Sequence, residues 1–339
     1  MKFPKKLNIG DYIGVTAISD GVKKEADFLR MNNAIKNLEN LGYKVIETEN
    51  ARKSENGRSS SKEQRVREFM SLWNNEKVKA ILFSNGGDFG FEILEELDID
   101  EISKIEPKWI SGYSDITTLG FVLTTNFDIA TIYGPNYKSF GMEIIHKSLL
   151  NEIKLMNGKE IIQNSFEKCQ GLEEFLGTTD SFEDSLTKNV KWKSLNGEGK
   201  IKFSGRSIGG CFDIVINLMG SKFDKVTEYI DRYKEDGIIW FLESFEISTP
   251  QLQINLWKMK NAGYFKNCRG IVFGRPLFVR EDYNLTYIEA VRESLKDLNI
   301  PIICDADIGH LAPQISIVNG AILEVEYENG KGKIKNIFR

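Results

Sequence analysis

Histidine is scarce in this chain, with two in 339 residues, and histidine is the side chain that most often performs acid–base chemistry at neutral pH. His146 stands in Glu143-Ile-Ile-His146, a spacing that can ligate a metal from one helix. Such carboxylate-bridged sites need a second copy, which the sequence lacks, so we interpret His146 as a partly exposed surface residue. His310 follows a predicted strand at 301–304, on the kind of loop where open α/β sheets place their sites. His310 is therefore the candidate general base.

A nucleophile for this histidine is expected on a sharp turn between a strand and a helix, because such a turn exposes the side chain and directs backbone N–H groups at an oxyanion. Ser114 in Gly112-Tyr113-Ser114-Asp115 fits, since a strand is predicted at 110–113 and a helix begins near Asp115. Alternatively, Ser114 caps that helix and Asp115 interacts with the helix dipole. The pattern alone leaves both open, and it lacks the second glycine of a Gly-x-Ser-x-Gly turn.

Two other glycine-rich turns could contribute to a site. Cys211 follows Gly209-Gly210 and precedes a predicted helix, where a thiolate can be activated, although a small buried thiol is the commoner reason for such a residue. The turn at 86–90 follows a buried strand and could bind an anion or supply oxyanion N–H donors. It has no nucleotide-binding fingerprint.

A carboxylate should orient the histidine and stabilise its cation. Glu243 is the best placed, because it comes at the carboxyl end of the predicted buried strand 238–242. Glu246 is its competitor, and a solvated loop carboxylate is the alternative reading of either residue.

The elements that must position these residues alternate between strands and helices. In the first half this alternation predicts a parallel sheet, and we assign residues 1–157 to an N-terminal α/β domain that carries the nucleophile. Its strands are predicted at 12–18, 43–46, 78–83, 110–113 and 129–133, with helices over 28–38, 66–73 and 115–123.

Residues 158–204 have weaker periodicity and are predicted to be a linker or insertion. Residues 205–339 form a predicted C-terminal α/β domain that carries the acid and the base. It would begin with a turn at 205–210 and would end with a β-hairpin, 314–318 and 321–327 around Asn319-Gly320. The fold class is α/β with two domains, and the active site is expected in the cleft between them.

Composition excludes several function classes. Forty-five Lys and Arg against forty-nine Asp and Glu give a net charge of −4, which offers no bulk attraction to a nucleic acid polymer. No apolar run approaches the ~20 residues of a membrane helix, so we expect a cytoplasmic protein without a membrane partner. The four cysteines have neither disulfide-framework nor zinc-site spacing, and we interpret them as reduced thiols.

Taken together, these segments resemble the LD-carboxypeptidase family of serine peptidases, which includes the microcin C immunity proteins. The resemblance extends over residues 13–326, with nucleophile, acid and base in the order Ser, Glu, His. It is carried by Gly-Tyr-Ser114-Asp-Ile-Thr, Phe-Leu-Glu243-Ser, Gly-His310-Leu-Ala-Pro-Gln, Ser84-Asn-Gly-Gly-Asp88, Gly205-Arg-Ser-Ile-Gly-Gly210 and Phe273-Gly-Arg-Pro276.

The resemblance implies a two-domain hydrolase with Ser114 as nucleophile, His310 as general base and then acid, and Glu243 orienting the imidazole. The backbone N–H groups of Gly87 and Asp115 would form the oxyanion hole. It implies no metal and no organic cofactor, and its members commonly form homodimers.

The segment 158–200, the Gly-Gly-Asp turn and Leu-Glu-Ser-Phe-Glu favour the microcin C immunity branch, which cleaves an amide between a C-terminal aminoacyl group and a nucleotide-like moiety. Trp192 would then cover the base of such a peptidyl-nucleotide, or else anchor the linker as a buried residue. Arg275 and Arg206 are candidate anion contacts, with structural ion pairs as the alternative. In the other branch the substrate is a muropeptide, a murein tetrapeptide that loses D-alanine. A non-catalytic ligand-binding protein, in which 86–90 holds an anion and Ser114 caps a helix, is the alternative of another class.

Overall fold

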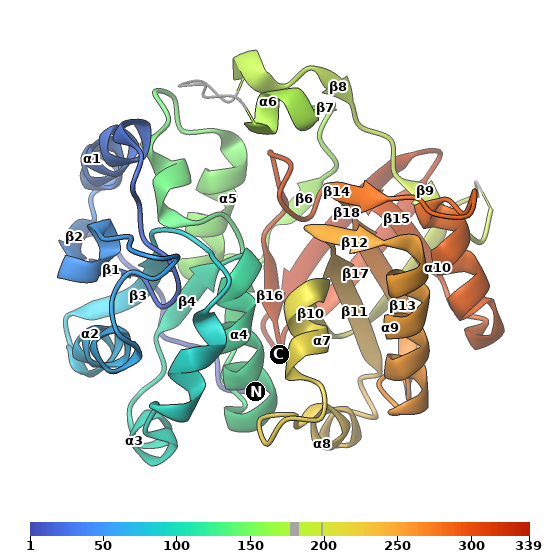
Figure 1. Ribbon diagram of the computed structural model, residues 1–339, viewed down its shortest axis with the longest axis horizontal. Coiled ribbons are helices and arrows are strands. Elements are labelled where there is room, and N and C mark those ends of the chain that lie inside the picture. Colours follow the sequence, from blue (N-terminus) through green and yellow to red (C-terminus); the bar gives the residue numbers. More distant parts are fainter. Residues whose placement is uncertain (177–182, 198) are drawn as a thin grey trace.

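The computed structural model describes residues 1–176, 183–197 and 199–339, and its main elements are two β-sheets flanked by helices. Figure 1 shows the N-terminal half, in blue and green, beside the C-terminal half, in yellow to red. The first sheet has the strand order β16-β5-β4-β3-β1-β2, and all its neighbours pair in parallel except β16 with β5. Its strands are β1 (Tyr12–Thr16), β2 (Lys44–Glu47), β3 (Val78–Phe83), β4 (Trp109–Gly112), β5 (Thr131–Tyr133) and β16 (Ile317–Asn319).

Helices of the first half follow the predicted apolar stripes. The buried side chains of the first helix are Met31, Ala34 and Leu38, which recur at helical spacing. The helices of the N-terminal half are α1 (Glu25–Asn40), α2 (Lys62–Asn74), α3 (Ile99–Lys104), α4 (Thr117–Phe127) and α5 (Lys147–Met156). Its 3₁₀ turns are η1 (Glu49–Arg52), η2 (Gly90–Glu95), η3 (Ser114–Ile116) and η4 (Tyr137–Gly141).

The second sheet has the order β6-β18-β17-β10-β11-β13-β15-β9, with a parallel centre from β10 to β15 and antiparallel strands outside it. Its strands are β6 (Ile162–Asn164), β9 (Lys193–Ser194), β10 (Ile201–Cys211), β11 (Ile238–Glu243), β13 (Cys268–Gly274), β15 (Ile302–Ala306), β17 (Ile322–Glu328) and β18 (Lys331–Ile337). Smaller elements are β7 (Lys168–Cys169) with β8 (Lys188–Asn189), β12 (Glu246–Ser248) with β14 (Phe278–Arg280), α6 (Leu172–Leu176), η5 (Glu183–Ser185), α7 (Phe212–Leu218), α8 (Val226–Arg232), α9 (Thr249–Asn261), α10 (Tyr287–Leu295) and η6 (Lys296–Leu298).

The two halves share an apolar core. Phe121 and Val122 of α4 belong to the same buried cluster as Phe212 of α7 and Trp240 of β11. In Figure 1, α4 and α7 lie where the two halves meet. Buried apolar contact of this kind stabilises a fixed arrangement of the halves rather than a loose tether.

The predicted α/β class is confirmed, as are most element positions. The strand predicted at 78–83 is β3, and the helix predicted over 66–73 lies within α2, which begins one residue after its cap Ser61. These elements were predictable because buried parallel strands are continuously apolar and amphipathic helices carry a periodic stripe.

Two predictions for the C-terminal half are wrong. Residues 205–210 lie inside strand β10 instead of forming a turn, and Gly209 is required there because a Cβ would stand 1.7 Å from the carbonyl oxygen of Phe241. Asn319-Gly320 does form a turn, but the strands on either side join different sheets, β16 the first and β17 the second. The terminal hairpin is β17 with β18, one strand later in the chain.

The segment 158–204 is less of a linker than its composition indicates. Two of its strands, β6 and β9, form the edges of the second sheet, and β7 pairs with β8. The domain boundaries at 157 and 204 stay a prediction. Among the described helices, none combines the length and apolar content that crossing a bilayer needs.

Candidate active site

Ser114 is the first residue of η3 and occupies a strained turn just after β4. Its backbone has φ +64°, a left-handed conformation that is costly for a residue with a side chain. The side chain is half-buried, and neither η3 nor α4 has a side-chain hydrogen bond at its N-cap. The capping alternative is therefore wrong, because the Ser114 hydroxyl does not cap either helical segment. The strained backbone thus sets the direction of the half-buried Ser114 side chain.

Gly86 and Gly87 bring the loop after β3 against this turn. A Cβ on Gly86 would stand 3.0 Å from both Cβ and Oγ of Ser114, and Gly87 has φ +145°. In the described part of the chain, the backbone N–H groups of Gly87 and Asp115 donate to no protein acceptor. Both N–H groups are thus unused by the protein, which an oxyanion hole would require of its donors.

The side chain of Asp115 connects the nucleophile turn to the glycine loop. Its Oδ2 accepts a hydrogen bond from the Gly90 N–H at 2.6 Å, and its Oδ1 accepts from the hydroxyl of Thr118 at 3.2 Å. The residue is 2% exposed, and burial raises the pKa of its carboxyl group. Asp115 therefore holds the two loops together through hydrogen bonds.

Glu243 and His310 meet at the carboxyl ends of two strands of the second sheet. His310 Nδ1 lies 2.9 Å from Glu243 Oε2, and the hydroxyl of Tyr133 donates to Glu243 Oε1. Glu243 is fully buried at the end of β11, whereas the competing Glu246 is exposed on β12. Because a carboxylate can only accept, Nδ1 carries the proton and Nε2 is left as the basic nitrogen. Glu243 is thus the acid that contacts the histidine.

Two aromatic rings hold the imidazole of His310. The ring of Tyr113 lies edge-on at 4.8 Å between centroids, and the ring of Phe245 lies at 4.7 Å. Burial, with a smaller contribution from Glu243, raises the pKa of the Tyr113 hydroxyl, which therefore stays neutral beside the imidazole. His310 Nε2 is buried and has no hydrogen-bond partner in the residues that the structure describes. It is the ring nitrogen that remains for a reaction.

Ser114 and His310 line the same pocket, which has a volume of about 470 Å³. Ser114 follows a strand of the first sheet and His310 follows a strand of the second, as expected for a site between two domains. Further lining residues come from α1 and its N-cap, from η4 and from α6. They include the cations Lys24, Arg30 and Lys138, the acids Asp27 and Glu174, and the apolar Phe175 and Leu176. A pocket with both charged and apolar walls suits a small amphipathic substrate.

Cys211 and His146 have structural surroundings. Burial, followed by the nearby Glu243 and Asp213, raises the pKa of the Cys211 thiol well above its ordinary value, so the thiolate needed for attack is disfavoured. His146 is buried, whereas we expected it to be partly exposed. It is the N-cap of α5, and its Nδ1 accepts the Ser148 N–H. Glu143 is exposed. Neither Cys211 nor His146 lines the pocket.

Trp192 and Arg275 do not line the pocket, which favours the structural alternative for both. Each bonds to Asp307, a fully buried carboxylate: Trp192 through Nε1 at 2.8 Å and Arg275 through Nη1. Trp192 is itself fully buried, and Arg275 also donates to the carbonyl of Leu311 at 3.0 Å. Both therefore hold the loop that carries His310. Arg206 forms an ion pair with Asp236 and is structural too.

Sequence reasoning missed Tyr133 and Asp307. Tyr133 ends β5 directly before Gly134-Pro135, which marks a strand end but gives no sign that its hydroxyl reaches Glu243. Asp307 was visible only as a neighbour of His310. Tyr133 and Glu243 are more than a hundred positions apart in the sequence, and so are Trp192 and Asp307. No local pattern could therefore have revealed these pairs.

Comparison with known proteins identifies the family of this chain. A family model for the LD-carboxypeptidase N-terminal domain matches residues 13–134, which contain Ser114, and one for the C-terminal domain matches 204–325, which contain Glu243 and His310. The putative carboxypeptidase YocD of Bacillus subtilis is 26% identical, over 98% of each chain. The microcin C7 self-immunity protein MccF of Escherichia coli is 26% identical over 95% of this chain and 92% of its own. A probable murein peptide carboxypeptidase of Bacillus subtilis is 25% identical over 94% and 89%.

Solved structures share the whole fold. An MccF-like protein from Bacillus anthracis superposes with a TM-score of 0.81 at 24% identity, over 100% of both chains. MccF in complex with glutamyl sulfamoyl guanosine gives a TM-score of 0.80 at 23% identity, over 98% of both. The two family models together match most of the chain, and this chain belongs to the LD-carboxypeptidase family of serine peptidases.

Proposed function

We propose that this carboxypeptidase uses Ser114, His310 and Glu243 as a catalytic triad and cleaves an amide near the C-terminal end of a small peptide or a peptidyl-nucleotide. The observation that carries the proposal is the pocket lined by Ser114 and by His310, whose Nδ1 lies 2.9 Å from the buried Glu243. A carboxylate that orients the imidazole, a base and a hydroxyl on a strained turn are the parts that acyl transfer requires.

In the proposed reaction His310 Nε2 takes the proton of the Ser114 hydroxyl while its oxygen attacks the amide carbonyl. The N–H groups of Gly87 and Asp115 hold the oxyanion, and His310 then gives its proton to the departing amine. Water attacks the resulting acyl-enzyme with His310 acting as base again. Glu243 keeps the imidazole in the tautomer with its proton on Nδ1 and stabilises the imidazolium.

The preferred substrate is a peptidyl-nucleotide of the microcin C type. The α6 segment, which comes from the additional residues 158–204, contributes Phe175 and Leu176 to the pocket wall, where apolar side chains can contact a planar base. MccF, crystallised with glutamyl sulfamoyl guanosine, has the same fold. We propose Phe175 for the contact that we expected of Trp192.

Cleavage of D-alanine from a murein tetrapeptide is the second candidate. It is favoured by the similar identity of the murein peptide carboxypeptidase, 25%, and MccF, 26%. The cations Lys24 and Lys138 in the pocket wall also suit a substrate with several carboxylates.

The test is a mass-spectrometric assay of the purified protein with a murein tetrapeptide and, separately, an aminoacyl-sulfamoyl adenosine. We expect one of them to be cleaved, and Ser114→Ala and His310→Ala to lower kcat by about 10⁴- to 10⁶-fold, because a triad acts as a unit. Ser114 should also be labelled by a fluorophosphonate, identified by peptide mass.

Ser114→Ala with wild-type turnover would overturn the triad. If neither substrate is cleaved and both the wild-type and Ser114→Ala proteins bind one of them equally, the pocket is a binding site without catalysis. The proposal would then be replaced by the ligand-binding alternative.

A further inference from the structure

Two loops form one unit beside the nucleophile. The loop at 84–90 follows β3 and contacts Ser114 through Gly86, and the loop at 17–21 follows β1 and packs on it. The Asp20 N–H donates to the Gly86 carbonyl at 3.1 Å. The backbone of the first loop therefore depends on the position of the second.

Ser19 strengthens this contact. Its hydroxyl accepts the Phe89 N–H at 3.2 Å, and it stands 2.4 Å from the point where a Cβ on Gly87 would lie. Gly87, the candidate oxyanion donor, is thus packed directly on Ser19. Any separation of the two loops would move the Gly87 N–H relative to Ser114.

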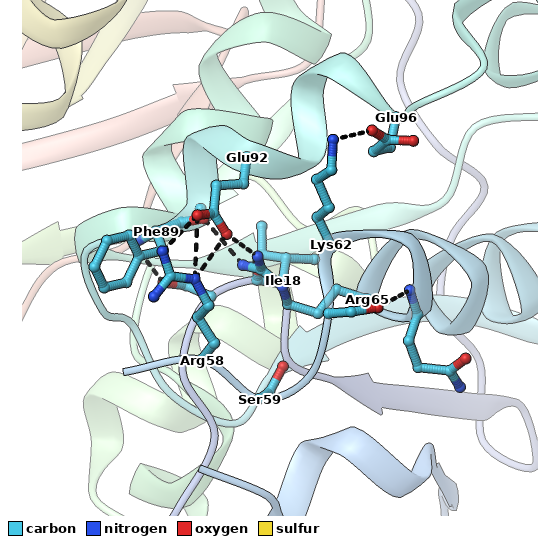
Figure 2. A network of polar contacts seen from close by, with 12 residues as sticks. Ile18, Arg58, Ser59, Lys62, Arg65, Phe89, Glu92 and Glu96 are labelled. Atoms are coloured by element: carbon cyan, nitrogen blue, oxygen red, sulfur yellow. Dashed lines mark hydrogen bonds and ion pairs between the residues drawn. The ribbon is translucent and has the colours of Figure 1, made fainter. Parts of the chain in front are cut away.

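Arg65 of α2 connects the loop at 17–21 to the loop at 84–90. It is fully buried and does not line the pocket. Its Nη1 donates to the Ile18 carbonyl at 2.8 Å and to the Phe89 carbonyl at 3.0 Å, so a single nitrogen holds one carbonyl from each loop. Figure 2 shows the guanidinium among these partners.

Glu92 provides the counter-charge that permits this burial. Arg65 Nη2 and the guanidinium of Arg58 both donate to its carboxylate. The hydrogen bond from Arg58, and then that from Arg65, lowers the pKa of the Glu92 carboxyl group. The Arg58 guanidinium also stacks on the ring of Phe89 at 3.5 Å. The network in Figure 2 thus grips Phe89 by its carbonyl and by its ring.

We propose that Arg65 is a positioning residue of the reaction, which fixes the Gly87 N–H at the distance from Ser114 that an oxyanion requires. This inference rests on the proposed function, because it concerns the same oxyanion hole. The C-terminal end of the loop is then held by two contacts: Asp115 accepts the Gly90 N–H and Arg65 donates to the Phe89 carbonyl. A donor that meets charge only in the transition state affects kcat far more than KM.

The test is Arg65→Lys, assayed on whichever of the two substrates the enzyme cleaves. A lysine keeps the charge beside Glu92 but lacks the planar fork that reaches two carbonyls and a carboxylate together. We expect kcat to fall by about 10- to 100-fold, as for a donor misplaced by about 1 Å, with KM changed by less than about threefold. A peptide boronate, which forms a tetrahedral adduct with the serine, should lose affinity by the same factor as kcat.

Two control variants on the same helix separate positioning from stability. Lys62→Ala removes the ion pair of Lys62 with Glu96, which contacts neither loop, and should leave kcat unchanged. Phe69→Leu creates a small defect in the buried core of α2 and should lower the melting temperature while kcat at a low temperature stays near wild type.

If Arg65→Lys does not fold, Arg58→Ala serves in its place, because Arg58 is partly exposed and its loss removes the stacking on Phe89. A smaller fall in kcat, with the same proportional loss of boronate affinity, is expected. Unchanged kcat in a folded Arg65→Lys or Arg58→Ala protein overturns the inference. So does a Phe69→Leu protein whose kcat at the low temperature falls as far as that of Arg65→Lys for the same loss of melting temperature. Activity that survives Ser114→Ala would instead refute the proposed function, and the inference with it.

Discussion

A buried carboxyl group next to β4, that of Glu152, leads us to predict an unusual pH dependence of stability. Glu152 of α5 is fully buried, and its Oε1 accepts the hydroxyl of Ser111, which lies on β4 three positions before Ser114. Its Oε2 has no partner in the described residues. Burial raises the pKa of Glu152 from 4.5 to about 8. The folded protein therefore keeps this proton over a pH range in which the unfolded chain has released it.

The sign follows from linkage. Below pH 4.5 Glu152 is protonated in both states and costs nothing; as pH rises toward 8 only the unfolded chain loses the proton, so stability falls. A pKa that is raised from 4.5 to about 8 corresponds, at ~1.4 kcal/mol for each pKa unit, to about 5 kcal/mol of lost stability once the folded carboxyl is charged. Between about pH 6 and about pH 8 the loss is about 2 kcal/mol.

Glu152→Gln removes the titration and keeps an acceptor for Ser111. Among the described residues, Oε2 and the hydroxyl of Ser316 both lack a partner, and both lie 2.9 Å from the point where a Cβ on Gly134 would stand, so the new amide would face the same space as the Ser316 hydroxyl. Urea unfolding of the wild type should show about 2 kcal/mol less stability at pH 8 than at pH 6 relative to Glu152→Gln. Glu143→Gln, an exposed site before the same helix, should keep the wild-type slope. A Glu152→Gln protein with the wild-type pH slope would refute the reasoning.

Three further predictions concern the site. Gly86→Ala should lower kcat by about tenfold with the fold intact by circular dichroism, because its Cβ would stand 3.0 Å from the Oγ of Ser114; wild-type kcat would show that the loop can yield. Asp307→Asn should lower the unfolding free energy by about 3 kcal/mol, since it leaves the buried guanidinium of Arg275 without a counter-ion, and equal urea midpoints would contradict this. Cys211→Ala should keep kcat within about twofold, because the buried thiol does not line the pocket; loss of turnover in a folded protein would restore it as a nucleophile.

The sequence predicted those parts of the fold whose signal is local. Strand β3 is apolar over its whole length, and α1 carries its buried side chains at helical spacing, so both could be placed from a short window. The glycines of β10 misled the same reasoning. Glycine is a turn signal by its frequency in turns, but in β10 Gly209 and Gly210 serve close approach, to the Phe241 carbonyl and to Thr117.

Some residues of the candidate site could likewise be predicted from local sequence, whereas the contacts of others could not. The three proposed triad residues follow strands, and a chemically capable side chain at a strand's carboxyl end is readable from sequence. Trp192 and Arg275 have side chains that often bind ligands, yet Asp307 takes a hydrogen bond from each. What a buried polar side chain contacts depends on the tertiary fold, and for these residues only the structure could supply the partner.

Strand β16 explains how a site divided between two sheets can be kept in register. The loop that carries His310 leaves the second sheet at the end of β15, and a few residues later the chain enters the first sheet as β16, antiparallel to β5. In that pairing Ile317 lies opposite Tyr133, whose hydroxyl bonds to Glu243.

The crossing is fixed at its far end as well. The side chain of Asn319, the last residue of β16, accepts the Gly209 N–H of β10 at 3.0 Å and donates to the Gly209 carbonyl at 3.3 Å. A continuous ladder therefore runs from β4, which ends beside Ser114, through β5 and β16 to the second sheet. A rotation between the halves would have to break this ladder and the apolar core around α4. Adjustment to a substrate is consequently expected in the loops and in the α6 segment that border the pocket, while Ser114 and His310 keep their spacing.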